Sequence, residues 1–254
     1  MGRRFGQHFL VRQSVLERIA RAACGDDCGV VLEIGPGRGA LTSHLLTRSA
    51  RVIAVEIDQV LVHYLRSKFR AANLEVIEGD ILKTDLTRWG PLVVAGNLPY
   101  YITSPILDKV LGLGDLLSRA VFLVQKEVAD RLAAKPGTRD YGYLSVQTQV
   151  LSEIELLFTV PAAAFQPPPK VDSAVVRLTP RPHPLVKDIR AFLSFASLCF
   201  QHKRKTLRNN LLARYDKATL DAIPQATKRA EQLSIPELLA LYEALAGYTR
   251  RQPR

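Results

Sequence analysis

Short apolar runs alternate with longer segments of mixed apolar and polar positions through the first two-thirds of the chain. The runs are rich in valine and isoleucine, which is typical of parallel strands buried on both faces. Alternating strands and helices predict an α/β fold, in which helices cover both faces of a mostly parallel sheet. The expected strands are residues 30–34, 51–55, 74–77, 92–95 and 120–124. The expected helices between them are residues 40–48, 59–70 and 104–111.

Two later strand-like runs, residues 152–160 and 171–178, follow one another without a helix-length segment between them. The connection, residues 161–170, contains three consecutive prolines. Because neighbouring parallel strands need a long crossover connection, these two runs are expected to pair as an antiparallel hairpin at one edge of the sheet. The sheet is therefore predicted to be Rossmann-like, with parallel strands and a terminal hairpin.

A proline-rich segment, residues 180–184, changes the character of the chain. Three prolines in five residues continue neither a strand nor a helix, so this segment is a linker. Beyond it the sequence is helix-like and has no β-rich run. We expect one large domain over residues 1–180 and a small all-helical domain over residues 185–254.

Charge is the compositional feature that adds most to this picture. Lys and Arg number 35 against 24 Asp and Glu, a formal net charge of +11. An excess of this size favours a polyanionic partner, with nucleic acid ahead of an anionic membrane. Three cysteines and five scattered histidines give neither a disulfide framework nor a zinc site, so no metal is expected. Since no secretory signal, membrane-length apolar run or heptad pattern is present, we expect a cytoplasmic monomer without a membrane partner.

A glycine-rich loop, residues 33–42, follows the first expected strand and opens a helix. Gly35 and Gly37 let the backbone turn tightly and approach a ligand closely. The amides at the helix start add a partial positive field. Open α/β sheets bind ligands beyond the carboxyl ends of their central strands, so this loop is a candidate cofactor site.

The loop fits two cofactors. Its glycines and Ala40 match the dinucleotide pattern G-x-G-x-x-G/A, and Glu56 lies about 20 residues further on, where an acid binds the ribose. Glu33 and Asp80 favour S-adenosylmethionine, because one acid can hold its cationic methionine end and the other its adenine amino group. Each acid alone fits a helix cap equally well. Acids at three successive strand ends favour S-adenosylmethionine over NAD, and the NAD alternative stays open at this point.

The most specific motif is residues 96–100, which follow the fourth expected strand and match the (N/D)-P-P-(Y/F) loop of methyltransferases acting on planar amino groups. Such a nitrogen is a poor nucleophile, because its lone pair is delocalised. The Asn97 side-chain oxygen and the Leu98 carbonyl are expected to accept its two hydrogens. Pro99 stiffens the loop, and Tyr100 can stack on the base. The alternative is an Asn-X-Pro turn without a catalytic role.

Segments from nearly the whole chain carry one family pattern: residues 5–10, 32–42, 55–58, 79–80, 96–100, 165–176 and 200–209. On these segments the chain resembles the ribosomal RNA adenine dimethylase family, and within it the bacterial KsgA-type small-subunit enzymes. The resemblance implies a Rossmann-like class I methyltransferase sheet followed by a small helical domain. It also implies transfer of methyl groups from S-adenosyl-L-methionine, which becomes S-adenosyl-L-homocysteine. The implied substrate is the N6 atoms of two adjacent adenosines in a hairpin loop near the 3′ end of 16S rRNA, in the assembling small subunit, giving N6,N6-dimethyladenosine.

The resemblance also assigns site residues. Phe165 is implied to lie across the target adenine from Tyr100. Two positions depart from the commonest family pattern, since His8 stands where Asn is frequent and Tyr101 where a small polar residue is common. The implied cofactor contacts are His8, Leu10, Gly35, Gly37, Glu56, Asp80 and Asn97.

Basic residues crowd the segment that contains Lys203, Arg204, Lys205 and Arg208. We expect them to contact RNA phosphates, which positions the RNA without reading its sequence. A ribosome-assembly factor whose binding role outweighs catalysis is an alternative function. Methylation of the large ribosomal subunit is another, and the segment 165–176 argues against it.

Overall fold

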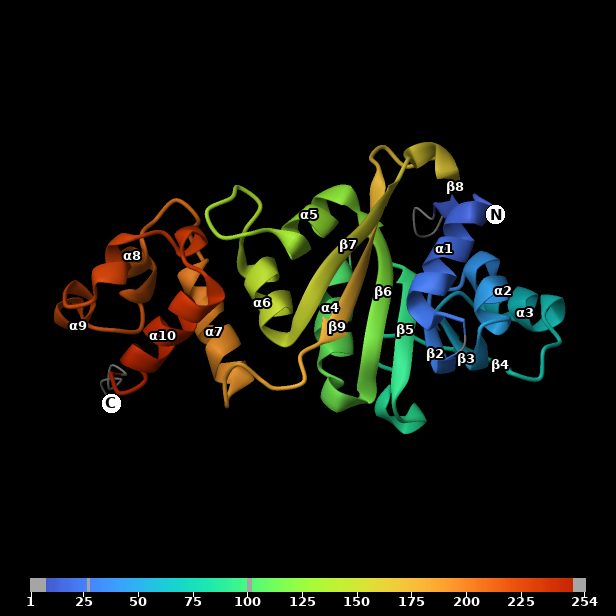
Figure 1. The fold of residues 1–254 in the computed structure, drawn as a ribbon, viewed down its shortest axis with the longest axis horizontal. Helices are drawn as coiled ribbons and strands as arrows, with labels where there is room; N and C mark the ends of the chain where they lie inside the picture. The colour runs from blue at the N-terminus through green and yellow to red at the C-terminus, as the bar shows by residue number, and fades with distance from the viewer. Residues whose placement is uncertain (1–7, 27, 100–101, 249–254) are drawn as a thin grey trace. The chain divides into compact units, whose positions relative to one another are not determined.

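The chain forms two compact units in a computed structural model that describes residues 8–26, 28–99 and 102–248 (Figure 1). The sheet unit comprises the described residues up to Ala129 together with Ser152–Pro182. The helical unit comprises Asp130–Leu151 and the described residues from His183 onward. The sequence analysis assigned the segment Asp130–Leu151 to the first domain. It belongs to the helical unit because Tyr141 and Val146 are buried in the helical core.

A seven-stranded sheet organises the sheet unit, in the order β4-β3-β2-β5-β6-β9-β7. The five strands from β4 to β6 are parallel, and β9 is antiparallel to both β6 and β7. The α/β fold class and the antiparallel hairpin at the sheet edge are thereby confirmed. The strands are β2 (Cys28–Ile34), β3 (Ser49–Glu56), β4 (Leu74–Glu78), β5 (Leu92–Asn97), β6 (Leu117–Gln125), β7 (Ser152–Val160) and β9 (Ser173–Pro180).

Helices connect the parallel strands. The three expected helices are present, each within two or three residues of its expected ends. A further helix, α1, precedes the sheet and was not predicted. Its buried side chains recur at helical spacing, and it ends at Gly25, whose φ of +64° suits glycine. The helices are α1 (Gln13–Cys24), α2 (Ala40–Leu46), α3 (Gln59–Lys68), α4 (Thr103–Leu111) and α5 (Lys126–Ala133).

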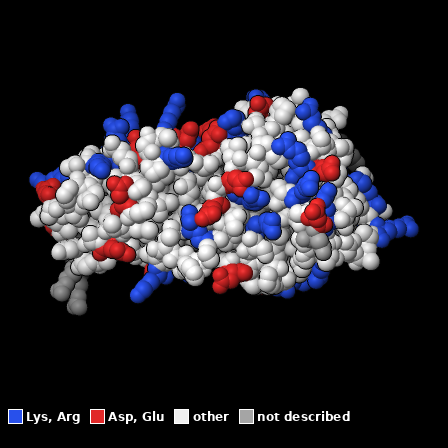
Figure 2. Space-filling model, viewed as in Figure 1, with Lys and Arg blue, Asp and Glu red and all other residues white. Residues whose placement is uncertain are grey.

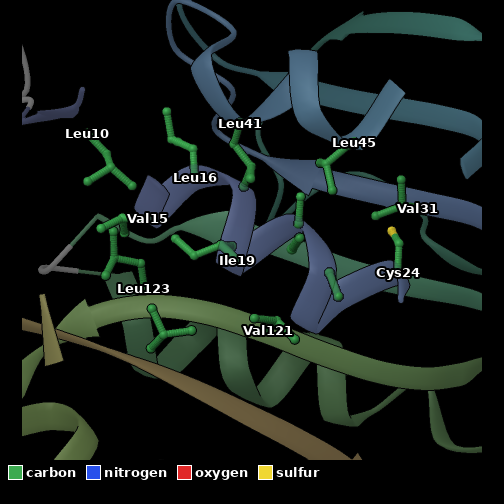
Figure 3. Close-up of a cluster of buried hydrophobic side chains, with 14 of the residues drawn as sticks. Leu10, Val15, Leu16, Ile19, Cys24, Val31, Leu41, Leu45, Val121 and Leu123 are labelled. Atoms are coloured by element: carbon green, nitrogen blue, oxygen red, sulfur yellow. The ribbon is translucent and has the colours of Figure 1, made fainter. Parts of the chain in front are cut away.

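One buried cluster fixes α1 and α2 on the same face of the sheet. Leu16 and Ile19 of α1 are each 1% exposed and belong to one cluster with Leu45 of α2 and Val121 of β6 (Figure 3). Burying an aliphatic side chain of this size contributes about 1.5–3 kcal/mol. Because Leu16 and Ile19 also line the cavity described below, the core supports the wall of the site.

A second, two-stranded sheet pairs β1 (Phe9–Leu10) with β8 (Phe165–Gln166). Phe9 lies opposite Gln166, and Leu10 lies opposite Phe165. Two-residue strands have no detectable periodicity, so this pairing could not be predicted from the pattern of apolar and polar positions. It joins the N-terminal segment to the proline-rich loop before β9.

All the regular secondary structure in the described residues of the helical unit is α-helix or 3-10 helix, joined by loops. Its core contains Phe192, Phe195 and Leu238, each fully buried. The last helix begins at a capping box, in which Ser234 and Glu237 satisfy each other's backbone amides. The α-helices are α6 (Tyr143–Leu151), α7 (Ile189–Cys199), α8 (Leu207–Leu211), α9 (Lys217–Asp221) and α10 (Ile235–Leu245).

Candidate functional site

A cavity of about 560 Å³ lies in the sheet unit, at the carboxyl ends of β2, β3 and β5. This is the edge at which open α/β sheets bind ligands. Every residue implied as a cofactor contact lines it, and so do Leu98 and Pro99 of the predicted catalytic loop. The structure therefore brings the glycine-rich loop, the acids and the Asn97 loop to one place.

Glu56 ends β3 and faces the glycine-rich loop. Its Oε2 accepts a hydrogen bond from the Gly37 amide at 3.0 Å, and its Oε1 accepts from the Ile57 and Asp58 amides at 3.0 Å each. Gly37 has a φ of +57°, which suits glycine. Burial raises the pKa of Glu56, and the amide hydrogen bonds oppose that shift. A fixed, buried carboxylate at this point is suited to accept hydrogen bonds from ribose hydroxyls.

Glu33 lies near the end of β2 and is only 2% exposed. Its Oε2 accepts a hydrogen bond from the Thr42 hydroxyl at 2.6 Å. Burial raises the pKa of Glu33 to about 7, the Thr42 hydrogen bond lowers it, and the charge of Glu56 raises it further. A cationic ligand group beside Glu33 would favour its ionised form. The position therefore fits the positively charged end of a ligand.

Asp80 follows β4 and lines the cavity. Its Oδ1 accepts a hydrogen bond from the Leu82 amide at 2.9 Å, and its backbone carbonyl accepts one from the Lys83 amide at 2.9 Å. Asp80 thus stabilises the turn after β4 as well as facing the cavity. These hydrogen bonds give Asp80 a role within the turn, and its contact with a ligand stays a prediction.

The Asn97 loop is held by its neighbours in the sheet. A Cβ atom at Gly96 would lie 2.7 Å from the Ile34 carbonyl oxygen, so only glycine fits there. The Leu98 amide donates to the Leu123 carbonyl at 3.0 Å, and the Asn97 Nδ2 donates to the His8 carbonyl at 3.2 Å. These contacts fix a polar amide against the cavity.

The structure does not bring every predicted residue to the cavity. Phe165 is 4% exposed and packs in the buried cluster with Leu16 and Ile19, so its ring is part of the core and does not line the cavity. Its expected partner Tyr100, and Tyr101, lie outside the described residues.

Several cavity residues were missed by the sequence analysis. The Phe9 ring packs on the glycine-rich loop, since a Cβ at Gly37 would lie 3.0 Å from Phe9 Cε1. The Arg38 guanidinium lies 5.0 Å from the centre of that ring. Gln166 and Pro167 also line the cavity. These residues lie in the family segments 5–10, 32–42 and 165–176, but the family pattern did not predict their contacts.

The predicted RNA-contacting residues lie in the helical unit. Lys203, Arg204 and Lys205 are exposed. The Lys203 Nζ donates to the Arg139 carbonyl. The Arg208 guanidinium pairs with Asp221, which raises the pKa of Arg208 and lowers that of Asp221. Figure 2 shows Lys and Arg side chains spread over the visible face, with Asp and Glu among them.

The described part of the chain has neither a metal-type cluster nor a helix long enough to cross a membrane. No cluster of three or more His, Cys, Asp or Glu residues there has a geometry that could hold a metal ion. No helix there has the length and apolarity that crossing a bilayer requires.

Similarity to known proteins extends over nearly the whole chain. A family model described as ribosomal RNA adenine dimethylase matches residues 1–246. The ribosomal RNA small subunit methyltransferase A of Gloeobacter violaceus is 47% identical over 262 residues, which cover 96% of this chain and 93% of that protein. The protein of the same name from Koribacter versatilis is 44% identical over 266 residues, covering 95% and 93%.

Solved structures agree with the family match. A dimethyladenosine transferase from Plasmodium falciparum superposes with a TM-score of 0.83 at 27% identity, covering 95% of this chain and 99% of that one. The 23S rRNA methyltransferase ErmE superposes with a TM-score of 0.71 at 33% identity, covering 94% and 99%. The chain therefore belongs to the ribosomal RNA adenine dimethylase family.

Proposed function

We propose that this protein transfers methyl groups from S-adenosyl-L-methionine to the N6 atoms of two adjacent adenosines near the 3′ end of 16S rRNA. The observation that carries the proposal is that Asn97, from the amino-group motif, lines the same cavity as the buried acids Glu33 and Glu56. The relatives named as small-subunit methyltransferases support 16S rRNA as the substrate. The product is N6,N6-dimethyladenosine, and the reaction accompanies biogenesis of the small subunit.

The acids and the glycine-rich loop hold the cofactor, which supplies an electrophilic methyl group on a sulfonium. Glu56 accepts hydrogen bonds from the ribose, and Asp80 accepts them from the adenine amino group. Glu33 provides negative charge for the cationic methionine end. Leu10 and the Phe9 ring close the cavity over this ligand from the N-terminal side. The proposal includes no metal, because the sulfonium itself activates the methyl group for transfer.

The Asn97 loop prepares the nucleophile. The Asn97 Oδ1 and the Leu98 carbonyl accept the two hydrogens of the adenine amino group, which favours a pyramidal nitrogen with an available lone pair. By holding that nitrogen in place beside a bound methyl donor, Asn97 and Leu98 would supply most of the rate enhancement. No strong general base is required, because the methylated amine loses its proton readily. Tyr100 stacks on the base in this proposal.

The basic surface of the helical unit holds the RNA. Lys203, Arg204 and Lys205 contact phosphates, and the target adenosine leaves a loop, which costs less than extrusion from a duplex. The same proposal expects a monomer in the cytoplasm, together with the small subunit.

A nucleoside analysis tests the reaction. Small subunits that lack the modification are incubated with the protein and S-adenosylmethionine, and the digested RNA is examined by mass spectrometry for N6,N6-dimethyladenosine. Asn97→Ala should reduce its formation at least about 100-fold, because the acceptor nitrogen is no longer positioned. Calorimetric binding of S-adenosylmethionine to both proteins controls for folding. Binding of NAD in place of S-adenosylmethionine would instead support the dehydrogenase alternative.

A ribosome-assembly role that outweighs catalysis is the second candidate. It is favoured by the basic segment, since Lys203, Arg204 and Lys205 lie in the helical unit and none of them lines the cavity. Asn97→Ala separates the two roles. If the inactive variant binds subunits as tightly as the parent and restores their maturation, the binding role is the principal one.

A further inference from the structure

His8 is held through both its side chain and its main chain. The imidazole Nδ1 lies 2.8 Å from the Pro167 carbonyl oxygen, and the His8 carbonyl oxygen accepts the hydrogen bond from Asn97 Nδ2 at 3.2 Å. The adjacent pairing of Phe9 with Gln166 runs the two backbones side by side. His8 therefore connects the loop that contains Pro167 to the amide of Asn97.

The contact with His8 determines which way the Asn97 amide faces. A backbone carbonyl only accepts hydrogen bonds, so the amide must present its NH₂ group to His8. Its oxygen is then on the other side of the amide group, in a residue that lines the cavity. A rotated amide would present NH₂ to the adenine amino group. Two donors would then face each other, and the amine would lose the acceptor that prepares it for attack.

The contact between the His8 imidazole and Pro167 holds His8 in place, and with it the carbonyl that orients the Asn97 amide. The Pro167 carbonyl also only accepts, so Nδ1 must carry a hydrogen. Both the imidazolium and the neutral tautomer protonated at Nδ1 meet that requirement. The interaction therefore depends on a donor at this position and not on the charge of the ring.

We propose that His8 is a positioning residue for methyl transfer, whose bond to Pro167 holds its carbonyl so that the Asn97 amide turns Oδ1 toward the acceptor nitrogen. The inference rests on the proposed function and adds to it a second role for His8 beside cofactor contact. It also couples the two loops. Displacement of the Pro167 loop would release the amide that prepares the nucleophile.

A matched pair of variants tests this role. The Nδ2 of an asparagine lies the same number of bonds from Cα as the Nδ1 of a histidine, so His8→Asn keeps a donor for Pro167. His8→Asp has the same shape but offers only acceptors. We expect the kcat of His8→Asp to lie about tenfold or more below that of His8→Asn, as for one lost hydrogen bond. Calorimetry gives the cofactor dissociation constant of each variant, which separates a change in kcat from a change in cofactor affinity.

The outcomes of these measurements distinguish a positioning role from a cofactor contact. Equal kcat values for the two variants would overturn the proposal, and so would a loss confined to cofactor affinity, which would make His8 a cofactor contact only. The ¹⁵N resonance of the Asn97 side chain, assigned with Asn97→Ala, should shift in His8→Asp and stay in place in His8→Asn. That signal is independent of turnover. If the parent protein methylates no ribosomal RNA, the proposed function fails, while an unmoved Asn97 signal in His8→Asp would still overturn the positioning role.

Discussion

At the scale of single residues, the cavity contains two carboxyl groups that water barely reaches. Glu33 and Glu56 are 2% and 3% exposed, and burial raises the pKa of each. Backbone amides donate hydrogen bonds to the Glu56 carboxylate, which offsets part of the cost of burying its charge. The Glu33 carboxylate accepts a hydrogen bond from the Thr42 hydroxyl. Glu33 is thus the less stabilised anion of the two, and its protonation should respond to pH near neutrality.

We predict that Glu33 makes the ligand-free protein less stable as the pH rises. Its pKa is about 7 in the folded chain against 4.5 in the unfolded chain, so between these values the folded state binds one proton more. Stability then falls through this window and levels off above about pH 7, by up to about 3 kcal/mol for this group. Glu33→Gln removes the titration but can still accept from Thr42.

Denaturant unfolding of both proteins, at pH values from about 5 to about 8, checks this prediction. The variant should gain stability relative to the parent as the pH rises. Glu56 is present in both proteins, so only the part of its titration that depends on the charge of Glu33 remains in the difference. Parallel stability curves would mean that Glu33 is already ionised in the folded chain.

Site residues were predictable where their role follows from chemistry and position along the chain. Asn97, Glu56 and Asp80 stand at the ends of strands, and parallel strands bring those ends to one edge. Phe165 was assigned from a resemblance, and its ring is in the core. The direction of a side chain depends on packing with distant residues, which no local pattern contains. The link from His8 to Asn97 joins residues 89 positions apart, and it was beyond local reasoning for the same reason.

At the scale of elements, the central strands were predicted more accurately than the two-residue strands and the amphipathic helix α1. The central strands are continuous apolar runs, and each was found at its expected place. The paired β1 and β8 are two residues long, so their formation depends on the partner strand and not on their own composition. Helix α1 was overlooked, although Val15, Leu16 and Ile19 follow the helical period.

The capping box of α10 gives a prediction at this scale. The Ser234 side chain accepts from the Glu237 amide, and Glu237 Oε2 accepts from the Ser234 amide at 2.8 Å. Ser234→Ala leaves a helix-end amide without its partner and should lower the free energy of unfolding by about 0.5–2 kcal/mol. Denaturant unfolding followed by circular dichroism measures the change.

Ser197→Ala is the matched control, because Ser197 is exposed in the interior of α7, in the same unit. Alanine is the better helix former, so this variant should be neutral or slightly stabilised. If both substitutions have the same effect, the box does not stabilise α10.

At the scale of the whole molecule, each unit is built from chain segments that are not contiguous. The helical unit takes in Asp130–Leu151, which lies between strands β6 and β7 of the sheet unit. The chain crosses between the units three times, after Ala129, Leu151 and Pro182, and the change in composition near residue 180 marks only the last crossing. The first crossing has no proline-rich linker, because α5 continues from one unit into the other. A boundary inside a continuous helix leaves no compositional sign.

The net charge of +11 leads to a prediction for the complete protein. Binding to small subunits should weaken steeply as salt rises, because phosphate contacts release counterions. Arg204→Ala and Lys205→Ala should each reduce the slope of log K against log salt by about 1. Arg208→Ala should change the slope less, because the Arg208 guanidinium is already paired with Asp221. Filter binding over a series of salt concentrations gives the slopes.

The comparison among these three variants separates local phosphate contacts from a general effect of charge. Each substitution removes one positive charge, so a purely long-range attraction would lower all three slopes equally. Direct contacts lower the slope only where the cation meets a phosphate. If the slope falls equally in the three variants, RNA binding depends on the overall electrostatic field of the protein. If the slope falls by about 1 in Arg204→Ala and Lys205→Ala and by less in Arg208→Ala, the RNA contacts the exposed segment that precedes α8.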